Sequence, residues 1–275
     1  MPPRKIGPGP GVRRRDAEGA VPAAAALQRL QEAFQVFQRT RQGEGENLEQ
    51  SARAVTADEL IQHPSADVRL WVAKCLAEVL MIFVPAPPIE SERMPRVLEL
   101  LISQLAWLRD SSAPNYQHAL HLLDRLAEVR CFMLLFDCPD PVRLLCALVT
   151  TCLDVVRQAK DDQVLVESTL AQVLGSILGE ADELPKAVLK ELVEELVPRN
   201  GPNAAGLVRL VLKHLAHRSA AVPVNDFLTQ SLIEATQDDL AMPLTAAQRG
   251  DALEQVLCSI YEVYVVEPAL VARVL

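Results

Sequence analysis

Aromatic residues are scarce in this chain: they make up 4% of its 275 residues, although half of the sequence is hydrophobic. Leu, Ala and Val supply most of the apolar side chains. Apolar residues of this kind pack well between helices, whereas a β-sandwich needs more Tyr, Phe, Thr and Ile. The composition therefore argues against a sandwich and predicts an all-α protein.

Excess positive charge is also missing, because the formal net charge is −9 at pH 7. Proteins that wrap nucleic acid bind it with clustered Lys and Arg, so this chain is not expected to do so. Basic residues do gather in residues 1–20, a Pro- and Gly-rich segment that contains Arg13–Arg15. We predict a disordered tail there, which acts as a nuclear import signal, contacts DNA or has no function of its own.

Long apolar runs are absent too, since no uninterrupted run reaches the ~18 to 20 residues that span a bilayer. The N-terminus also lacks the apolar segment of a secretory signal. The six cysteines lie in apolar helical contexts and lack the Cys-x2-Cys spacing of a structural zinc site. We expect reduced thiols that pack as small hydrophobic groups inside the cell.

Sequence signatures of enzymes are missing: there is no Gly-x-Ser-x-Gly elbow, no Gly-rich phosphate loop and no His-Glu-x-x-His. Two histidine pairs, His118 with His121 and His214 with His217, have a spacing that can place two metal ligands on one helix face. No third ligand accompanies either pair, so surface or groove-lining histidines are the favoured interpretation. We expect a protein that is not an enzyme and needs no metal or cofactor.

What the sequence does contain is helical periodicity, interrupted at regular intervals by Pro and Gly. The predicted helices span residues 22–40, 46–62, 65–83, 92–110, 115–135, 140–159, 162–179, 184–197, 203–218, 224–239 and 246–266. No segment alternates clearly enough to be a strand. Residues 21–275 are therefore expected to form a single helical-repeat domain.

The segment His63–Leu80 has the pattern of the hinge and second helix of a HEAT-type hairpin. Pro64 ends one helix, Ser65 can cap the next, and Val68 begins a wide apolar stripe at helical spacing. The Val142-Arg143 pair follows a similar Pro/Asp hinge 74 positions after Val68-Arg69. We interpret this echo as two repeats of ~37 residues, with both valines in the core and Arg linking neighbouring units. Two unrelated helix starts are the alternative.

Two further features bear on function. Arg209, Lys213 and His217 recur at every fourth position, which predicts a basic ridge along one helix for an acidic peptide or a polyphosphate. Ordinary helix surface is the alternative for this ridge. Residues 264–275 open a fresh apolar helix and stop, so we expect the repeat domain to be truncated at its C-terminus.

Three segments in this order resemble one family, the cohesin-associated proteins named for precocious dissociation of sisters. They are Asp67–Leu80 (DVRLWVAKCLAEVL) leading into Val84–Pro87, Asn115–Asp137 (NYQHALHLLDRLAEVRCFMLLFD), and Leu196–Asn203 (LVPRNGPN). The resemblance is collinear and covers roughly residues 60 to 275. Family members are longer hook-shaped helical proteins, so this chain corresponds to the N-terminal arm.

The resemblance implies a HEAT-like α-solenoid that acts as a nuclear, chromatin-associated regulator of cohesin in sister-chromatid cohesion. It implies protein partners, namely cohesin subunits together with cohesin release and protection factors. Some members of the family also bind an inositol polyphosphate. A generic HEAT-repeat adaptor for transport or phosphatase assembly is the alternative function.

Overall fold

The computed structural model describes residues 22–159, 163–181, 184–196 and 204–216, together with residues 257, 258 and 261. Within these ranges every regular element is a helix, and no strand is present. The α-helices are α1 (Ala23–Arg39), α2 (Glu49–Val55), α3 (Asp58–Ile61), α4 (Ala66–Ile82), α5 (Met94–Gln104), α6 (Tyr116–Val129), α7 (Pro141–Gln158), α8 (Val164–Glu180), α9 (Lys186–Leu196) and α10 (Ala205–Ala216). Three 3-10 helices are interspersed: η1 (Glu46–Leu48), η2 (Leu105–Arg109) and η3 (Cys131–Asp137).

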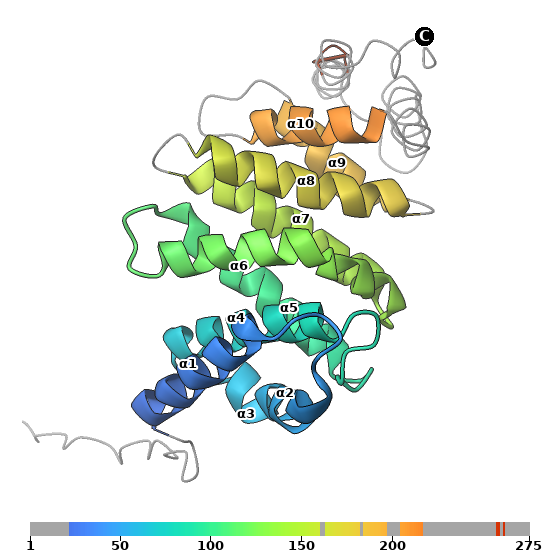
Figure 1. The fold of residues 1–275 in the computed structure, drawn as a ribbon. Coiled ribbons are helices and arrows are strands. Elements are labelled where there is room, and N and C mark those ends of the chain that lie inside the picture. The colour runs from blue at the N-terminus through green and yellow to red at the C-terminus, as the bar shows by residue number, and fades with distance from the viewer. Residues whose placement is uncertain are drawn as a thin grey trace, which may run out of the picture.

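The helices form two layers that rise along one axis (Figure 1). In one layer, helices α1, α4, α6, α8 and α10 follow one another, each packed on the next. In the other layer α3, α5 with η2, α7 and α9 do the same. Each unit therefore pairs one helix from each layer, and the described helices stack as successive hairpins rather than as a bundle around one centre. This arrangement is the HEAT-like α-solenoid expected from the sequence.

Successive helices of one layer run in the same direction. The Asn115 amide of α6 faces Asp67 of α4, and Arg125 faces Glu78, at separations of 48 and 47 positions. In the next pair of units Gly206 lies against Glu167 and His214 lies against Gly175, both 39 positions apart. The repeat length therefore varies along the stack, from 48 to 39 residues.

This register corrects the repeat expected at Val142-Arg143. The helix α4 that contains Val68 and the helix α7 that contains Val142 lie in different layers, so they are not equivalent parts of two repeats. Val68 is fully buried, but Val142 is 49% exposed, and the expectation that it enters the core is wrong. Leu144, Leu145 and Leu148 set the buried face of α7 instead. Arg143 does link neighbouring units, since its Nη1 lies 2.6 Å from Glu99 of α5.

Most predicted helices are confirmed to within two residues or so, but three are interrupted. The span 46–62 breaks into η1, α2 and α3, while 92–110 and 115–135 end in the 3-10 turns η2 and η3. Ser65 is the N-cap residue of α4, as expected, although its side chain makes no capping hydrogen bond. The predicted basic tail of residues 1–20 and the predicted helices 224–239 and 246–266 lie outside what the structure describes, apart from three residues.

None of the helices formed by the described residues is both long enough and apolar enough to cross a bilayer. The described residues also contain no group of three or more His, Cys, Asp or Glu side chains arranged to hold a metal ion.

Candidate functional site

The basic ridge predicted from the sequence begins on α10, near the end of the described stack. Arg209 is half-buried and Lys213 is exposed, one turn apart on the same helix. His214, next to Lys213, is also exposed, and its Cβ lies close to Gly175 of α8. His217 lies outside the described residues. The structure thus brings two of the three predicted side chains onto one helix surface.

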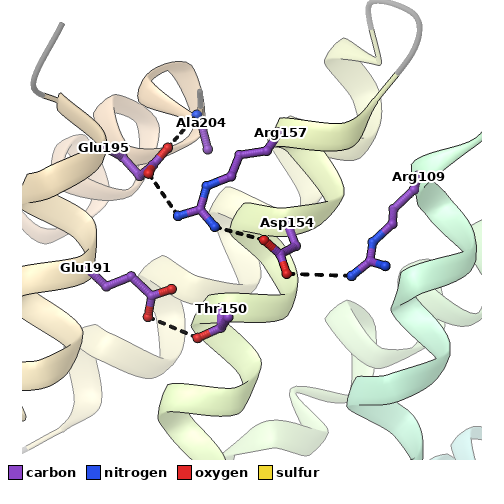
Figure 2. A network of polar contacts seen from close by, with 7 residues as sticks. All are labelled: Arg109, Thr150, Asp154, Arg157, Glu191, Glu195 and Ala204. Carbon is purple, nitrogen blue, oxygen red and sulfur yellow. Dashed lines mark hydrogen bonds and ion pairs between the residues drawn. The ribbon is translucent and has the colours of Figure 1, made fainter. Parts of the chain in front are cut away.

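A polar ladder crosses the other layer and joins three units (Figure 2). Arg157 of α7 lies at its centre, with Nη1 2.8 Å from Asp154 Oδ1 and Nη2 2.8 Å from Glu195 Oε1 of α9. Asp154 also faces Arg109 Nη2 of η2, at 3.7 Å. Glu195 is almost completely buried, and its second oxygen accepts a hydrogen bond from the backbone N–H of Ala204 at 2.9 Å. Its carboxylate therefore ties α7 to the start of α10.

A second rung lies one turn along the same two helices. The Thr150 hydroxyl of α7 donates to Glu191 Oε2 of α9 at 3.0 Å (Figure 2). Burial raises the pKa of the Glu191 carboxyl, and the hydrogen bond from Thr150 opposes that shift. The hydrogen bond that Arg157 donates to Glu195 raises the pKa of Arg157. Asp154 and Glu195 each contact an arginine, and Glu191 is held by the Thr150 hydroxyl, so the ladder has a structural role in stacking units.

A buried cation lies in the layer of α1, α4 and α6. Lys74 is 5% exposed, and its Nζ sits 4.3 Å from the ring centroids of both Phe34 and Trp71. The same ammonium lies 3.2 Å from Nδ1 of His118. Burial lowers the pKa of Lys74, since desolvation disfavours the charged form. Three helices thus enclose one ammonium group with aromatic faces and an imidazole.

His118 and His121, singled out above as a pair, do share one face of α6, and both line this cluster. The His118 ring lies 5.0 Å from Trp71, and the His121 ring lies 5.7 Å from Phe34. Burial lowers the pKa of both imidazoles, and the charge of Lys74 lowers it further. Both histidines are half-buried and pack against side chains of α1 and α4.

Burial leaves three of the thiols as poor nucleophiles. Burial raises the pKa of Cys75 and of Cys152 to about 12, and it raises the pKa of Cys131 as well. A thiol in this state is almost entirely protonated near neutral pH and is therefore a poor nucleophile.

Sequence reasoning missed the Lys74 cluster and the polar ladder. Lys74 stands at i+3 from Trp71 on α4, but only the packing of α1 and α6 shows that its ammonium is enclosed. The ladder joins Arg157 to Glu195 across 38 positions of sequence. A charged residue at a core-facing helical position is the one signal that could have indicated either.

Comparisons with known proteins assign the chain to a family. The family model for "Sister chromatid cohesion protein PDS5 protein" matches residues 24–275. The chain is 26% identical over 274 residues to PDS5 homolog B-A of Xenopus laevis. This alignment covers 97% of this chain and 18% of that relative. The chain is also 26% identical to human PDS5 homolog B over 226 residues, covering 80% of this chain and 15% of the relative. The chain thus spans less than a fifth of the length of these curated relatives.

Among solved structures, the Pds5 chain of the Pds5–Scc1 complex has the same fold, with a TM-score of 0.78 at 18% sequence identity. The match covers 92% of this chain and 38% of the solved one. The collinear segments, the two-layer solenoid and the family model agree over nearly the whole chain. This protein belongs to the PDS5 family of sister chromatid cohesion proteins.

Proposed function

We propose that the chain is a non-catalytic scaffold that regulates cohesin in sister-chromatid cohesion, on chromosomes in the nucleus, by binding segments of partner proteins. The observation that carries this proposal is the family match over residues 24–275. A solenoid supports it physically, because stacked helices present an extended surface on which a partner segment can lie. The ion pair between Arg157 and Glu195 and the raised pKa of the buried Cys152 thiol support a binding role over a catalytic one.

The partners follow from the same family. A relative with this fold was solved in complex with Scc1, and we propose that cohesin subunits of that kind bind this chain. The test is a binding assay between the full chain and purified cohesin subunits, including the Scc1 type, with an unrelated HEAT-repeat protein of similar charge as the control. Saturable binding to at least one subunit, absent from the control, supports the proposal. Binding to none would favour a generic HEAT-repeat adaptor instead.

The ridge on α10 is proposed as an anion contact within this function. Lys213 is exposed in a chain whose net charge is −9, so it provides local positive charge on an otherwise acidic protein. Arg209 lies one turn earlier and extends the same surface. A phosphate-rich or carboxylate-rich ligand would be attracted here by charge and held by the Arg fork.

The ridge is tested with Arg209→Glu combined with Lys213→Glu, using polyglutamate and inositol hexakisphosphate as two separate probes. Reversing two charges at a contact should weaken binding of the acidic probe by about tenfold or more. The matched control is Lys186→Glu with Lys190→Glu on α9, which changes the net charge equally at two exposed positions. Equal losses in both variants, or no loss in either, would reject the ridge, and the subunit-binding assay would stand independently.

A further inference from the structure

The first described helix is held in place by a cluster that contains a buried ammonium group and two imidazoles. Phe34 and Gln38 come from α1, Trp71 and Lys74 from α4, and His118 and His121 from α6. We propose that Lys74, His118 and His121 form a proton-sensitive latch, which holds α1 on α4 and α6 while both imidazoles are neutral and releases α1 when they are protonated.

His118 is the proton acceptor that makes the latch possible. Its Nδ1 lies 3.2 Å from Lys74 Nζ, and an ammonium group can only donate, so Nδ1 must accept with its lone pair. Protonation of Nδ1 would replace this acceptor with an N–H donor. It would also place a second positive charge against the buried ammonium, so both the hydrogen bond and the charge balance would be lost.

His121 adds a second proton site on the side of α1. Its Nε2 lies 3.5 Å from the Gln38 amide nitrogen, and its ring packs edge-on against Phe34. Because an amide nitrogen donates, Nε2 accepts this hydrogen bond, and Nδ1, which is buried without a hydrogen-bond partner in the described structure, carries the N–H of the neutral ring. In the imidazolium form Nε2 would also carry a proton, which would face the Gln38 N–H donor, so this hydrogen bond would be lost.

Among the charged groups around the two imidazoles, Asp124 of α6 raises the pKa of His121, but burial and the charges of Lys74 and Arg125 outweigh it. On α4, Glu78 is buried, and its carboxylate is already engaged by Arg125 Nε of α6 at 3.1 Å. Arg125 also binds Glu128 at 2.7 Å, while Asp124 of α6 is exposed to water. The contacts described for α1 come from the Phe34 ring and the Gln38 amide, both uncharged. On the far side of α6, Glu167 of α8 faces Gly206.

The direction of the effect follows from the shifted pKa values. Burial, and after it the charge of Lys74, lowers the pKa of both imidazoles in the closed form. The open form then binds protons more tightly than the closed form. The latch is therefore fully closed above the ordinary histidine pKa and opens as the pH falls below about 6.5. Because α1 packs mainly on α4, its release leaves the rest of the stack in place.

The experiment is hydrogen exchange by mass spectrometry on the full chain at several pH values. The ratio of exchange in α1 to exchange in α7 removes the intrinsic pH dependence, and α7 contains no histidine. The open form binds the imidazole protons more tightly, so this ratio should rise several-fold between pH 7.5 and pH 5.5, and by at most about tenfold for each histidine, because pH 5.5 lies about one unit below the ordinary histidine pKa. Circular dichroism at both pH values checks that the helices persist.

Three variants separate the latch from general acid destabilisation. His118→Asn with His121→Asn keeps a hydrogen-bond acceptor for Lys74 but cannot be protonated, so the pH dependence of the ratio should disappear. His214→Asn changes an exposed histidine on α10 and should retain the wild-type response. Lys74→Met, which removes the buried charge, should reduce the response even if the double variant folds poorly.

The proposal is overturned by either of two results. One is a ratio that stays constant from pH 7.5 to pH 5.5 in the wild type. The other is a rise of the same size in the wild type and in the variant lacking both imidazoles, since acid would then loosen α1 through other groups.

Discussion

Burial sets the chemistry of individual side chains in this protein. Cys152 is completely buried, and its surroundings raise the pKa of its thiol to about 12. Such a thiol acts as a small hydrophobic group, and it stays protonated in the folded state up to a high pH. In the unfolded chain the same thiol ionises near its ordinary pKa of about 8.5.

The Cys152→Ala substitution should therefore cost less free energy of unfolding at high pH than at neutral pH. Above about pH 8.5 the unfolded state releases the Cys152 proton while the folded state keeps it, so wild-type stability falls by up to about 1.4 kcal/mol per pH unit until the folded pKa is reached. The alanine variant has no thiol to ionise, so its stability does not fall for this reason. Urea unfolding at pH 7, 9 and 10 measures the gap in free energy of unfolding, which should narrow as the pH rises.

The control for that experiment is Leu148→Ala, which removes a buried side chain without an ionisable group from the same helix, α7. Its gap from the wild type should stay constant with pH. A constant gap for Cys152→Ala as well would show that this thiol ionises in the folded protein.

At the scale of the helix, close packing between α8 and α10 involves two glycines. A Cβ added at Gly175 would lie 2.5 Å from the Cβ of His214, an atom fixed by the helix backbone. A Cβ added at Gly206 would lie close to Glu167 Oε1, the end of a flexible side chain. The separation of the two helices therefore depends on Gly175, whereas at Gly206 a flexible side chain can move aside.

Gly175→Ala should destabilise the protein by about 1–3 kcal/mol, because the two helices must move apart to admit the methyl group. Gly206→Ala is the matched substitution on the facing helix, and it should cost less than about 1 kcal/mol, since Glu167 can change rotamer. Urea unfolding of both variants provides the comparison. Equal losses of free energy of unfolding in the two variants would mean that α8 and α10 move apart easily enough at Gly175 to admit a methyl group.

At the scale of the whole molecule, the polar ladder connects units that are distant in sequence. A solenoid unit contacts only its neighbours, so the strength of each interface decides whether the stack unfolds as one body. Arg157 and Glu195 provide such an interface between α7 and α9, and Glu195 continues it to Ala204 before α10 (Figure 2).

Arg157→Ala should lower the free energy of unfolding by about 2–3 kcal/mol, because it leaves the buried Glu195 carboxylate without its cation. The loss should appear first in α9 and α10, whose amide protons would exchange before those of α4 and α6. Hydrogen exchange by mass spectrometry resolves the helices separately.

The matched control is Arg53→Ala, which breaks an ion pair with Glu49 in which both side chains are mostly exposed. That pair should contribute less than about 1 kcal/mol. Uniform loss of protection along the whole stack in Arg157→Ala would contradict a local role for the ladder.

Local signals in the sequence are enough to predict most of the helices and to indicate the family. Helical periodicity and Pro or Gly breakers are local signals, which is why α1, α4 and α7 begin and end close to the predicted residues. The segments around Asp67 and Asn115 indicated the family for the same reason, because they are short local motifs that occur in the same order as in the family. The prediction that Val142 and Val68 occupy equivalent positions in two repeats was wrong, because a short local motif does not show which layer a helix joins.

Tertiary structure decided the register of the repeats and the positions of the buried charges. Lys74 meets His118 across 44 positions, and Arg157 meets Glu195 across 38. Neither separation follows from a fixed period, because the units differ in length and each loop sets its own offset. Only the stacking of whole helices brings these groups together, and with them the enclosed ammonium, the neutral imidazoles and the ladder between units.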